Sequence, residues 1–89
     1  MKKFNNAITE IAEEVERRGY ELMGVKPSSI HPDEYGELFD ILVKRDSGRY
    51  VVWSVTVIGN IPDFYWGTYF DGDNDRDIFF KALQRFNSK

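Results

Sequence analysis

Residues 49–70, with the sequence RYVVWSVTVIGNIPDFYWGTYF, constrain the fold more than any other part of this chain. They contain both tryptophans but only two charged side chains. β-Branched and aromatic side chains suit a pleated, half-buried surface, so this stretch predicts two strands. Residues 59–63 (GNIPD) separate the two apolar runs and have the composition of a turn. The pattern therefore indicates a sheet, while nothing in it names a reaction.

A helix is predicted at each end of the chain. Between residues 4 and 18, apolar side chains recur at the spacing of an amphipathic helix: Phe4, Ala7, Ile8, Ile11, Ala12 and Val15. Gly19 suits a left-handed position just after this helix. A second helix is expected from about residue 75 to 87, and Asp73 or Asn74 can cap its first turn.

Four strands are expected between the helices. The first is a short candidate at residues 20–25, and the others cover residues 36–45, 50–58 and 64–70, with a proline-containing loop at 26–33. Gly48 allows a tight hairpin between the second and third strands. The predicted fold is a single two-layer α+β domain over residues 1–89, with an antiparallel sheet of three to four strands and both helices on one sheet face.

Alternation along the strands divides the side chains between two faces. Trp53 and its alternate neighbours Val51, Val55 and Val57 are assigned to the core beneath the helices, together with Phe64, Trp66 and Phe70. Both tryptophans are therefore expected to pack against Ile8, Ile11, Phe79 and Leu83. Gly67 leaves a gap, which suggests that another backbone or side chain approaches it closely.

Composition narrows the function classes. A chain of 89 residues predicts one domain. The absence of cysteine excludes disulfides and thiolate zinc sites. Residues 1–6 lead into no apolar run, so we expect no signal peptide and a cytoplasmic location. A net charge of −3 argues against a protein that binds nucleic acid by neutralising phosphates.

The acidic stretch at residues 71–77 resembles a calcium-binding loop in the spacing of its oxygen ligands. However, Arg76 stands where such a loop needs glycine, and Ala82 stands where a closing glutamate is needed. We therefore expect no metal site here, and interpret the stretch as a solvated loop that caps the second helix. A contact surface for a basic partner is the alternative.

Catalytic chemistry finds little support in the residue pattern. His31 is the only histidine, and it lies in a loop near Asp33, Glu34 and Glu37. Ser28 and Ser29 are close in sequence, but no oxyanion-hole turn accompanies them. Paired carboxylates remain formally possible, although nothing places two of them in one apolar cleft. We therefore predict no enzyme activity, no catalytic residues and no cofactor.

The outer sheet face is predicted to be rich in tyrosine, with Tyr50, Tyr65 and Tyr69. These rings could form a protein interface, in which tyrosine is enriched. They could also stack the bases of single-stranded RNA, although few cations lie near them. A third reading is that they only cover a small two-layer fold.

Two segments, YVVW at residues 50–53 and FYWGTYF at 64–70 leading into a C-terminal helix, resemble small proteins of phages and conjugative elements of Gram-positive bacteria. The resemblance implies a helix–sheet–helix architecture. Some similarly small, acidic phage proteins are anti-CRISPR inhibitors, so it also implies possible inhibition of a host defence nuclease. It covers about the last two-thirds of the chain and carries over no functional residue.

The sequence therefore predicts a non-enzymatic protein-binding module, with a host or phage protein, such as a nucleic-acid-processing enzyme, as its partner. Direct binding to nucleic acid or membrane is not expected, and the chain is expected to be a monomer or homodimer. The predicted partner-binding residues are Tyr50, Tyr65, Tyr69, Asp71, Asp73, Asp75 and Asp77. The alternatives are a nucleic-acid-binding accessory protein of a mobile element and a small structural domain.

Overall fold

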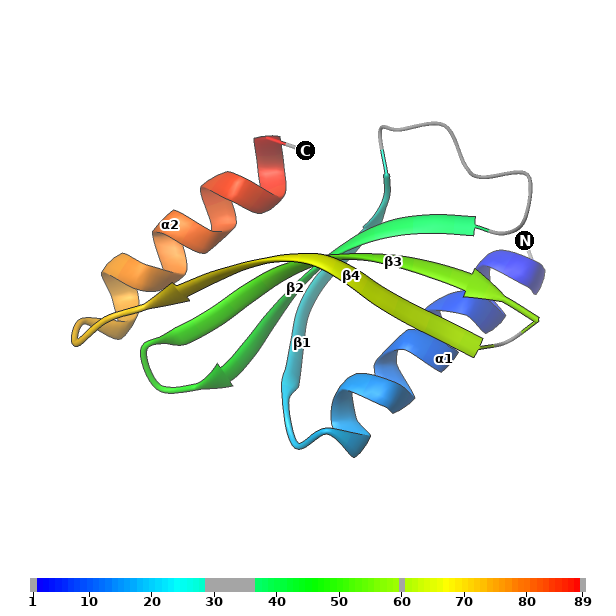
Figure 1. The fold of residues 1–89 in the computed structure, drawn as a ribbon, viewed down its shortest axis with the longest axis horizontal. Helices are drawn as coiled ribbons and strands as arrows, with labels where there is room; N and C mark the ends of the chain where they lie inside the picture. The colour runs from blue at the N-terminus through cyan, green and yellow to red at the C-terminus, as the bar shows by residue number, and fades with distance from the viewer. Residues whose placement is uncertain (1, 29–36, 60, 89) are drawn as a thin grey trace.

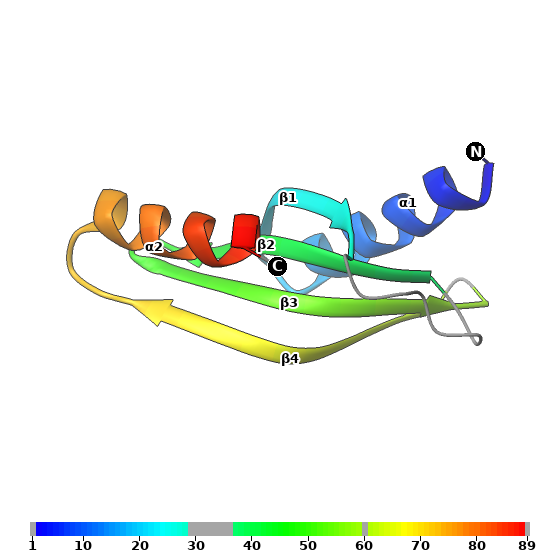
Figure 2. The ribbon, with the colours of Figure 1, turned by 90° about the horizontal axis from the view of Figure 1, so that it is seen from above.

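The structure is a computed structural model that describes residues 2–28, 37–59 and 61–88. In chain order its elements are α1 (Lys2–Arg17), β1 (Glu21–Pro27), β2 (Glu37–Asp46), β3 (Arg49–Ile58), β4 (Ile61–Asp71) and α2 (Asp75–Ser88). The strands form one antiparallel sheet in the order β1-β2-β3-β4, with β4 at one edge (Figures 1 and 2). The predicted α+β class is thus confirmed, and the short first strand belongs to the sheet.

The predicted helix end at Gly19 is confirmed. Gly19 has a φ of 80°, its N–H donates to the carbonyl of Glu16 at 2.9 Å, and the N–H of Tyr20 donates to the carbonyl of Val15 at 3.1 Å. These two bonds satisfy carbonyls that the last turn of α1 leaves without helical partners, in the arrangement that a left-handed glycine makes possible. The chain therefore turns directly from α1 into β1.

The other predicted turns differ in how well they match. At the start of α2, the side chain of Asn74 accepts a hydrogen bond from the N–H of Asp77 at 3.2 Å, so Asn74 is the cap. Gly48 has the expected positive φ, at 74°. The turn between β3 and β4 is shorter than the predicted 59–63, because β4 already begins at Ile61. Gly59, with a φ of 56°, supplies the left-handed residue there.

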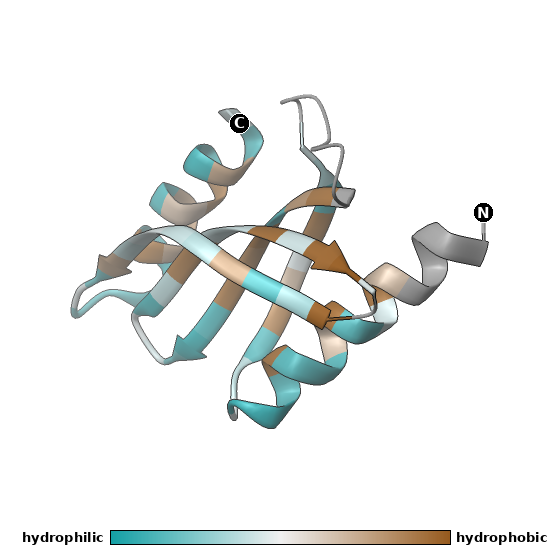
Figure 3. Ribbon diagram, turned by 45° about the vertical axis from the view of Figure 1, so that its right-hand side comes forward, coloured by the Kyte–Doolittle hydropathy of each residue, from teal (hydrophilic) through white to brown (hydrophobic). Residues whose placement is uncertain are grey.

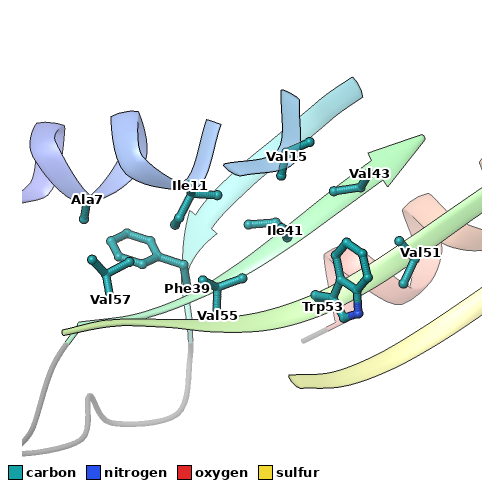
Figure 4. Packing of buried hydrophobic residues seen from close by; sticks show 10 residues of the cluster. All are labelled: Ala7, Ile11, Val15, Phe39, Ile41, Val43, Val51, Trp53, Val55 and Val57. Carbon is teal, nitrogen blue, oxygen red and sulfur yellow. The ribbon is translucent and has the colours of Figure 1, made fainter. Parts of the chain in front are cut away.

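The prediction that both helices cover one face of the sheet is wrong. Ala7, Ile11 and Val15 of α1 point towards one face of β2 and β3 (Figure 4). The strand residues in that cluster are Phe39, Ile41, Val43, Val51, Trp53, Val55 and Val57. Ile78, Ala82 and Phe86 of α2 instead pack against Leu42, Tyr50 and Val52, which alternate with the first set. The helices therefore lie on opposite faces, over opposite ends of the sheet (Figures 1 and 2).

The reason for this arrangement lies in β3. Every residue of this strand from 50 to 57 is buried, so both of its faces need a cover. A strand buried on both sides has a nearly continuous apolar sequence instead of a strict alternation. Two helices on one face would leave Tyr50, Val52 and Leu42 in water. Hydrophobic residues accordingly occupy long parts of the central strands, while many residues in the C-terminal half of α1 are hydrophilic (Figure 3).

Each of three strands contains an irregularity in which one residue is extra. The extra residues are Met23 in β1, Arg45 in β2, and one of the pair Trp66–Gly67 in β4, which together oppose Trp53. Such bulges reorient the side chains around them and change which residues share a face.

Two other predictions concern a membrane-spanning helix and the loop around His31. Within the described residues, neither helix combines the length and apolarity that crossing a membrane requires. The predicted surroundings of His31, including Asp33, Glu34 and Ser29, lie outside the described residues.

Candidate functional site

The bulge in β4 presents the most unusual side chain of the described structure. Trp66 has a φ of 56°, and it is the one described residue other than glycine with a positive φ. Its side chain is 68% exposed, and its ring meets that of Tyr65 edge-on, with centroids 4.8 Å apart. A left-handed conformation costs an ordinary residue about 1–2 kcal/mol, a cost that glycine does not carry. The predicted burial of Trp66 in the core is therefore wrong.

Gly67 explains why the bulge lies at this point of β4. A Cβ atom on Gly67 would lie 2.5 Å from Nε1 and 2.7 Å from Cδ1 of Trp53. Only a glycine lets the indole ring lie this close to the β4 backbone. The expectation of a close approach to Gly67 is thus confirmed, and of the two alternatives the approaching group is a side chain, that of Trp53.

The bulge also reverses the alternation of β4. Before it, Phe64 pairs with Val55 on the α1 face, and Tyr65 pairs with Ser54 on the α2 face. After it, Tyr69 pairs with Val51 on the α1 face, whereas Phe70 packs in the α2 cluster. The predicted grouping of Phe64 with Phe70 is therefore wrong, because strict alternation does not hold across an extra residue.

An arginine–aromatic cluster lies on the α1 face beyond the cover of α1, and we define it as Arg18, Tyr20, Arg45, Trp53, Phe64 and Tyr69. Trp53 is its centre, with ring centroids 5.2 Å from Phe64, 6.1 Å from Tyr69 and 6.3 Å from Tyr20. The Arg18 guanidinium lies 4.4 Å from the centroid of Phe64 and 5.6 Å from that of Trp53. Rings and guanidinium groups at these separations attract one another. The cluster is consequently a braced surface in which Tyr69 remains 52% exposed.

The three predicted tyrosines do not form one patch. Tyr50 is buried on the α2 face, where its hydroxyl donates to the Asp75 carboxylate at 3.1 Å. The Tyr65 hydroxyl is hydrogen-bonded to that of Thr56 at 2.5 Å on the same face. Tyr69 lies on the opposite face. The prediction failed because it assumed one open face, whereas α2 covers Tyr50 and the bulge moves Tyr69.

Of the four predicted aspartates, Asp75 has a structural role. Its carboxylate accepts a hydrogen bond from the Gly48 N–H at 2.6 Å and lies 3.6 Å from Nζ of Lys44. The hydrogen bond from Gly48, followed by that from Tyr50 and the charge of Lys44, lowers the pKa of Asp75. Burial raises the pKa of Tyr50, and the hydrogen bond to Asp75 raises it further. These contacts attach the start of α2 to the β2–β3 hairpin.

The remaining aspartates, Asp71, Asp73 and Asp77, are exposed near the same end of the sheet. Among the described residues, no three histidine, aspartate or glutamate side chains are placed to hold a metal ion together. The three carboxylates are exposed to solvent, whereas Asp75 is engaged within the fold.

Sequence reasoning also missed a polar row that crosses the sheet. Lys26, Asp40, Ser54 and Tyr65 are successive register partners on β1, β2, β3 and β4. Asp40 and Ser54 are only 1% and 2% exposed, and the Ser54 hydroxyl donates to Oδ1 of Asp40 at 3.4 Å. Such a buried network favours one strand register over others. The sequence shows Asp40 only as a polar residue within an apolar strand, and it does not show that Ser54 lies opposite it.

A groove between α2 and β4 is lined by Thr68, Phe70, Lys81, Gln84, Arg85, Asn87 and Ser88. Arg85 lies in the last turn of α2, where a cation complements the negative end of the helix dipole. The presence of a cation at position 85 is therefore explained by the stability of α2.

Comparison with protein-family models, with curated proteins and with solved structures gave no match. The candidate site consequently depends on geometry alone. It consists of two features that meet along β4: the exposed Trp66 at the bulge, whose ring contacts Tyr65, and the arginine–aromatic cluster on the α1 face.

Proposed function

We propose that this protein is a non-enzymatic module that binds another protein through Trp66 and the exposed ring of Tyr69. The observation that carries the proposal is the state of Trp66. Its large apolar ring is exposed to water, and its backbone has a left-handed conformation that is unfavourable for tryptophan. A glycine at this position would form the bulge without that cost. Within the fold, the described ring contact of Trp66 is the edge-on one with Tyr65, which leaves most of the indole exposed. Burial of the ring by a partner gives a stronger reason for a tryptophan here.

The composition of the surrounding surface supports the same proposal. Tryptophan, tyrosine and arginine dominate the residues that contribute most to protein–protein affinity. Tyr69 and Trp66 are exposed, and the ring of Tyr69 is braced by Trp53 beneath it. A braced side chain loses little conformational entropy on binding. We therefore assign the anchoring role to these two rings.

The exposed aspartates suggest the kind of partner. Asp71 ends β4 two residues after Tyr69, and Asp73 and Asp77 are exposed in the loop and helix turn that follow. Charges outside the centre of an interface mainly speed association and orient the partner. A basic surface, such as the groove of a nucleic-acid-processing enzyme, is complementary to them. The specific form of the proposal is that this protein belongs to a mobile element and inhibits a host defence nuclease. Such an inhibitor acts in the cytoplasm, which is the location we propose.

A nucleic-acid-binding function is the second candidate, and one observation favours it. Arg18 and Arg45 stack on aromatic rings beside the exposed Tyr69, as in surfaces that stack the bases of single strands. The net charge of −3 and the nearby aspartates oppose a polyanion, so we rank this function below protein binding.

The test compares two baits in a lysate of a candidate host: the wild-type protein and the Trp66→Gly variant. We expect a defined protein to be retained by the wild type and lost with Trp66→Gly, although that variant is folded by circular dichroism. A Tyr65→Phe bait serves as the matched control, since it keeps the ring that contacts Trp66. Retention of nuclease-sensitive RNA alone would replace the proposal with the second candidate.

A further inference from the structure

Arg45 differs from its neighbours in how its side chain is held. It is the extra residue of the β2 bulge, opposite Arg49 and Tyr50 of β3. Its guanidinium lies 5.7 Å from the ring centroid of Tyr20 and 5.6 Å from that of Tyr69. Two aromatic rings therefore fix a planar group that would otherwise sample many rotamers. The side chain remains partly accessible to solvent.

The other basic residues near this end of the sheet already have acidic partners. Arg17 and Arg18 both pair with Glu14, Lys44 lies near Asp75, and Arg49 lies 3.5 Å from Asp46. Among the side chains of residues 7–28, 38–59 and 61–88, no carboxylate lies within 4.0 Å of a nitrogen of Arg45. Arg45 is thus a preoriented cation whose hydrogen-bonding fork is not used by these parts of the fold.

We infer that Arg45 binds a carboxylate from a side chain of the partner protein, beside the anchoring ring of Tyr69. A guanidinium matches a carboxylate with two parallel N–H···O bonds, which fix orientation as well as adding affinity. The neighbouring Tyr69 hydroxyl can donate to the same group. This inference rests on the proposed function, because it names one group that the bound protein contributes.

A carboxylate fits this position better than the phosphates of a nucleic acid. Binding to a nucleic acid strand gains affinity by neutralising several successive phosphates. Around Arg45 the other cations are paired, and exposed carboxylates of Asp46 and Asp71 lie at the same end of the sheet. They would repel the successive charges of a polyanion more strongly than the single charge of one acidic side chain. The site is therefore built for a single negative charge.

The test follows the side-chain Nε–H resonance of Arg45 by nitrogen-15 NMR while blocked peptides are added. We expect acetyl-Gly-Glu-Gly-amide to shift this resonance in a saturable way and acetyl-Gly-Gln-Gly-amide to leave it unchanged. The Arg45→Lys variant, which lacks this resonance, is compared with the wild type through the backbone amide resonance of Tyr69. It should bind the glutamate peptide at least about tenfold more weakly, the effect of losing one charge-assisted hydrogen bond. Arg76→Lys is the matched control, since Arg76 also stacks on one ring, that of Phe80, but belongs to α2.

The outcomes separate this inference from the proposed function, because the peptides replace the unidentified partner. If neither peptide shifts Arg45, or if Arg45→Lys binds as the wild type does, the carboxylate site is refuted even where Trp66-dependent capture succeeds. If decauridylate shifts Arg45 saturably and the glutamate peptide does not, the site is a phosphate site and the inference fails. Saturable binding of the glutamate peptide alone, lost in Arg45→Lys, supports it.

Discussion

The indole ring of Trp53 lies directly against the backbone of Gly67, so close that a methyl group on Gly67 would overlap Nε1 at 2.5 Å. This contact joins the centre of the α1-face core to the edge strand. It also accounts for the bulge that presents Trp66 to solvent. The packing of one tryptophan thus determines how the other is displayed.

Gly67→Ala is the first test of this contact. We expect it to lower the free energy of unfolding by about 1–3 kcal/mol, because the core is too dense to accept the added atom. The change is measured by urea denaturation. In a Trp53→Leu background the same substitution should cost clearly less, since the ring that it meets is gone. Equal costs in the two backgrounds would show that the contact is not the cause.

The two tryptophans should respond in opposite ways to truncation. Trp53 is 7% exposed within the α1-face core, so Trp53→Ala should cost about 3–5 kcal/mol and leave little folded protein. Trp66→Ala removes a solvent-exposed ring and should change stability by less than about 0.5 kcal/mol. Iodide quenching of the wild type should affect one tryptophan strongly and the other weakly. Marked destabilisation by Trp66→Ala would contradict the surface role of that ring.

The Asp75 contacts predict a dependence of stability on pH. Because the pKa of Asp75 is lower in the folded protein than in the unfolded chain, its stabilisation is complete above the unfolded pKa of about 4. It is lost as the pH falls through the folded pKa. Asp75→Asn should therefore lower the melting temperature at pH 7, and the difference from wild type should shrink at lower pH. A loss of melting temperature in Asp75→Asn that stays the same at every pH would contradict a role for the ionised carboxylate.

Partner binding should depend more on the ring of Tyr69 than on the charge of Asp73. Tyr69→Ala removes an exposed ring, and it should weaken binding mainly by speeding dissociation. Asp73→Asn should have a smaller effect, confined to the association rate and reduced by salt. Both rates can be measured by surface plasmon resonance at two ionic strengths. A larger loss with Asp73→Asn would favour a mechanism based on charge mimicry.

Much of the fold could be predicted from local patterns. Helical spacing placed α1 and α2 within two residues of their observed ends, and Gly19 and Gly48 take the positive φ values that their turns required. These signals are local because capping and turn geometry depend on a few neighbouring residues. The four strands were likewise recognisable from their apolar and β-branched residues.

The distribution of side chains between faces could not be predicted as well. Deciding it requires knowing that β3 is covered on both sides, which depends on where α2 docks. It also requires the β4 bulge, for which the isolated Gly67 within a strand was the available signal. Trp66 was misplaced for that reason, and Tyr50 was expected at a surface that α2 covers. The clustering of Arg18 and Arg45 on the rings depends on tertiary contacts between distant segments.

The bulges also have a consequence for the edges of the sheet. Both edge strands are interrupted, β1 at Met23 and β4 at Trp66–Gly67, and β4 also contains Pro62, which has no N–H to donate. A regular edge is a template on which another copy can extend the sheet, and irregular edges prevent this. A small, aromatic-rich chain with a strongly apolar central strand is thereby protected against stacking into fibrils at high concentration.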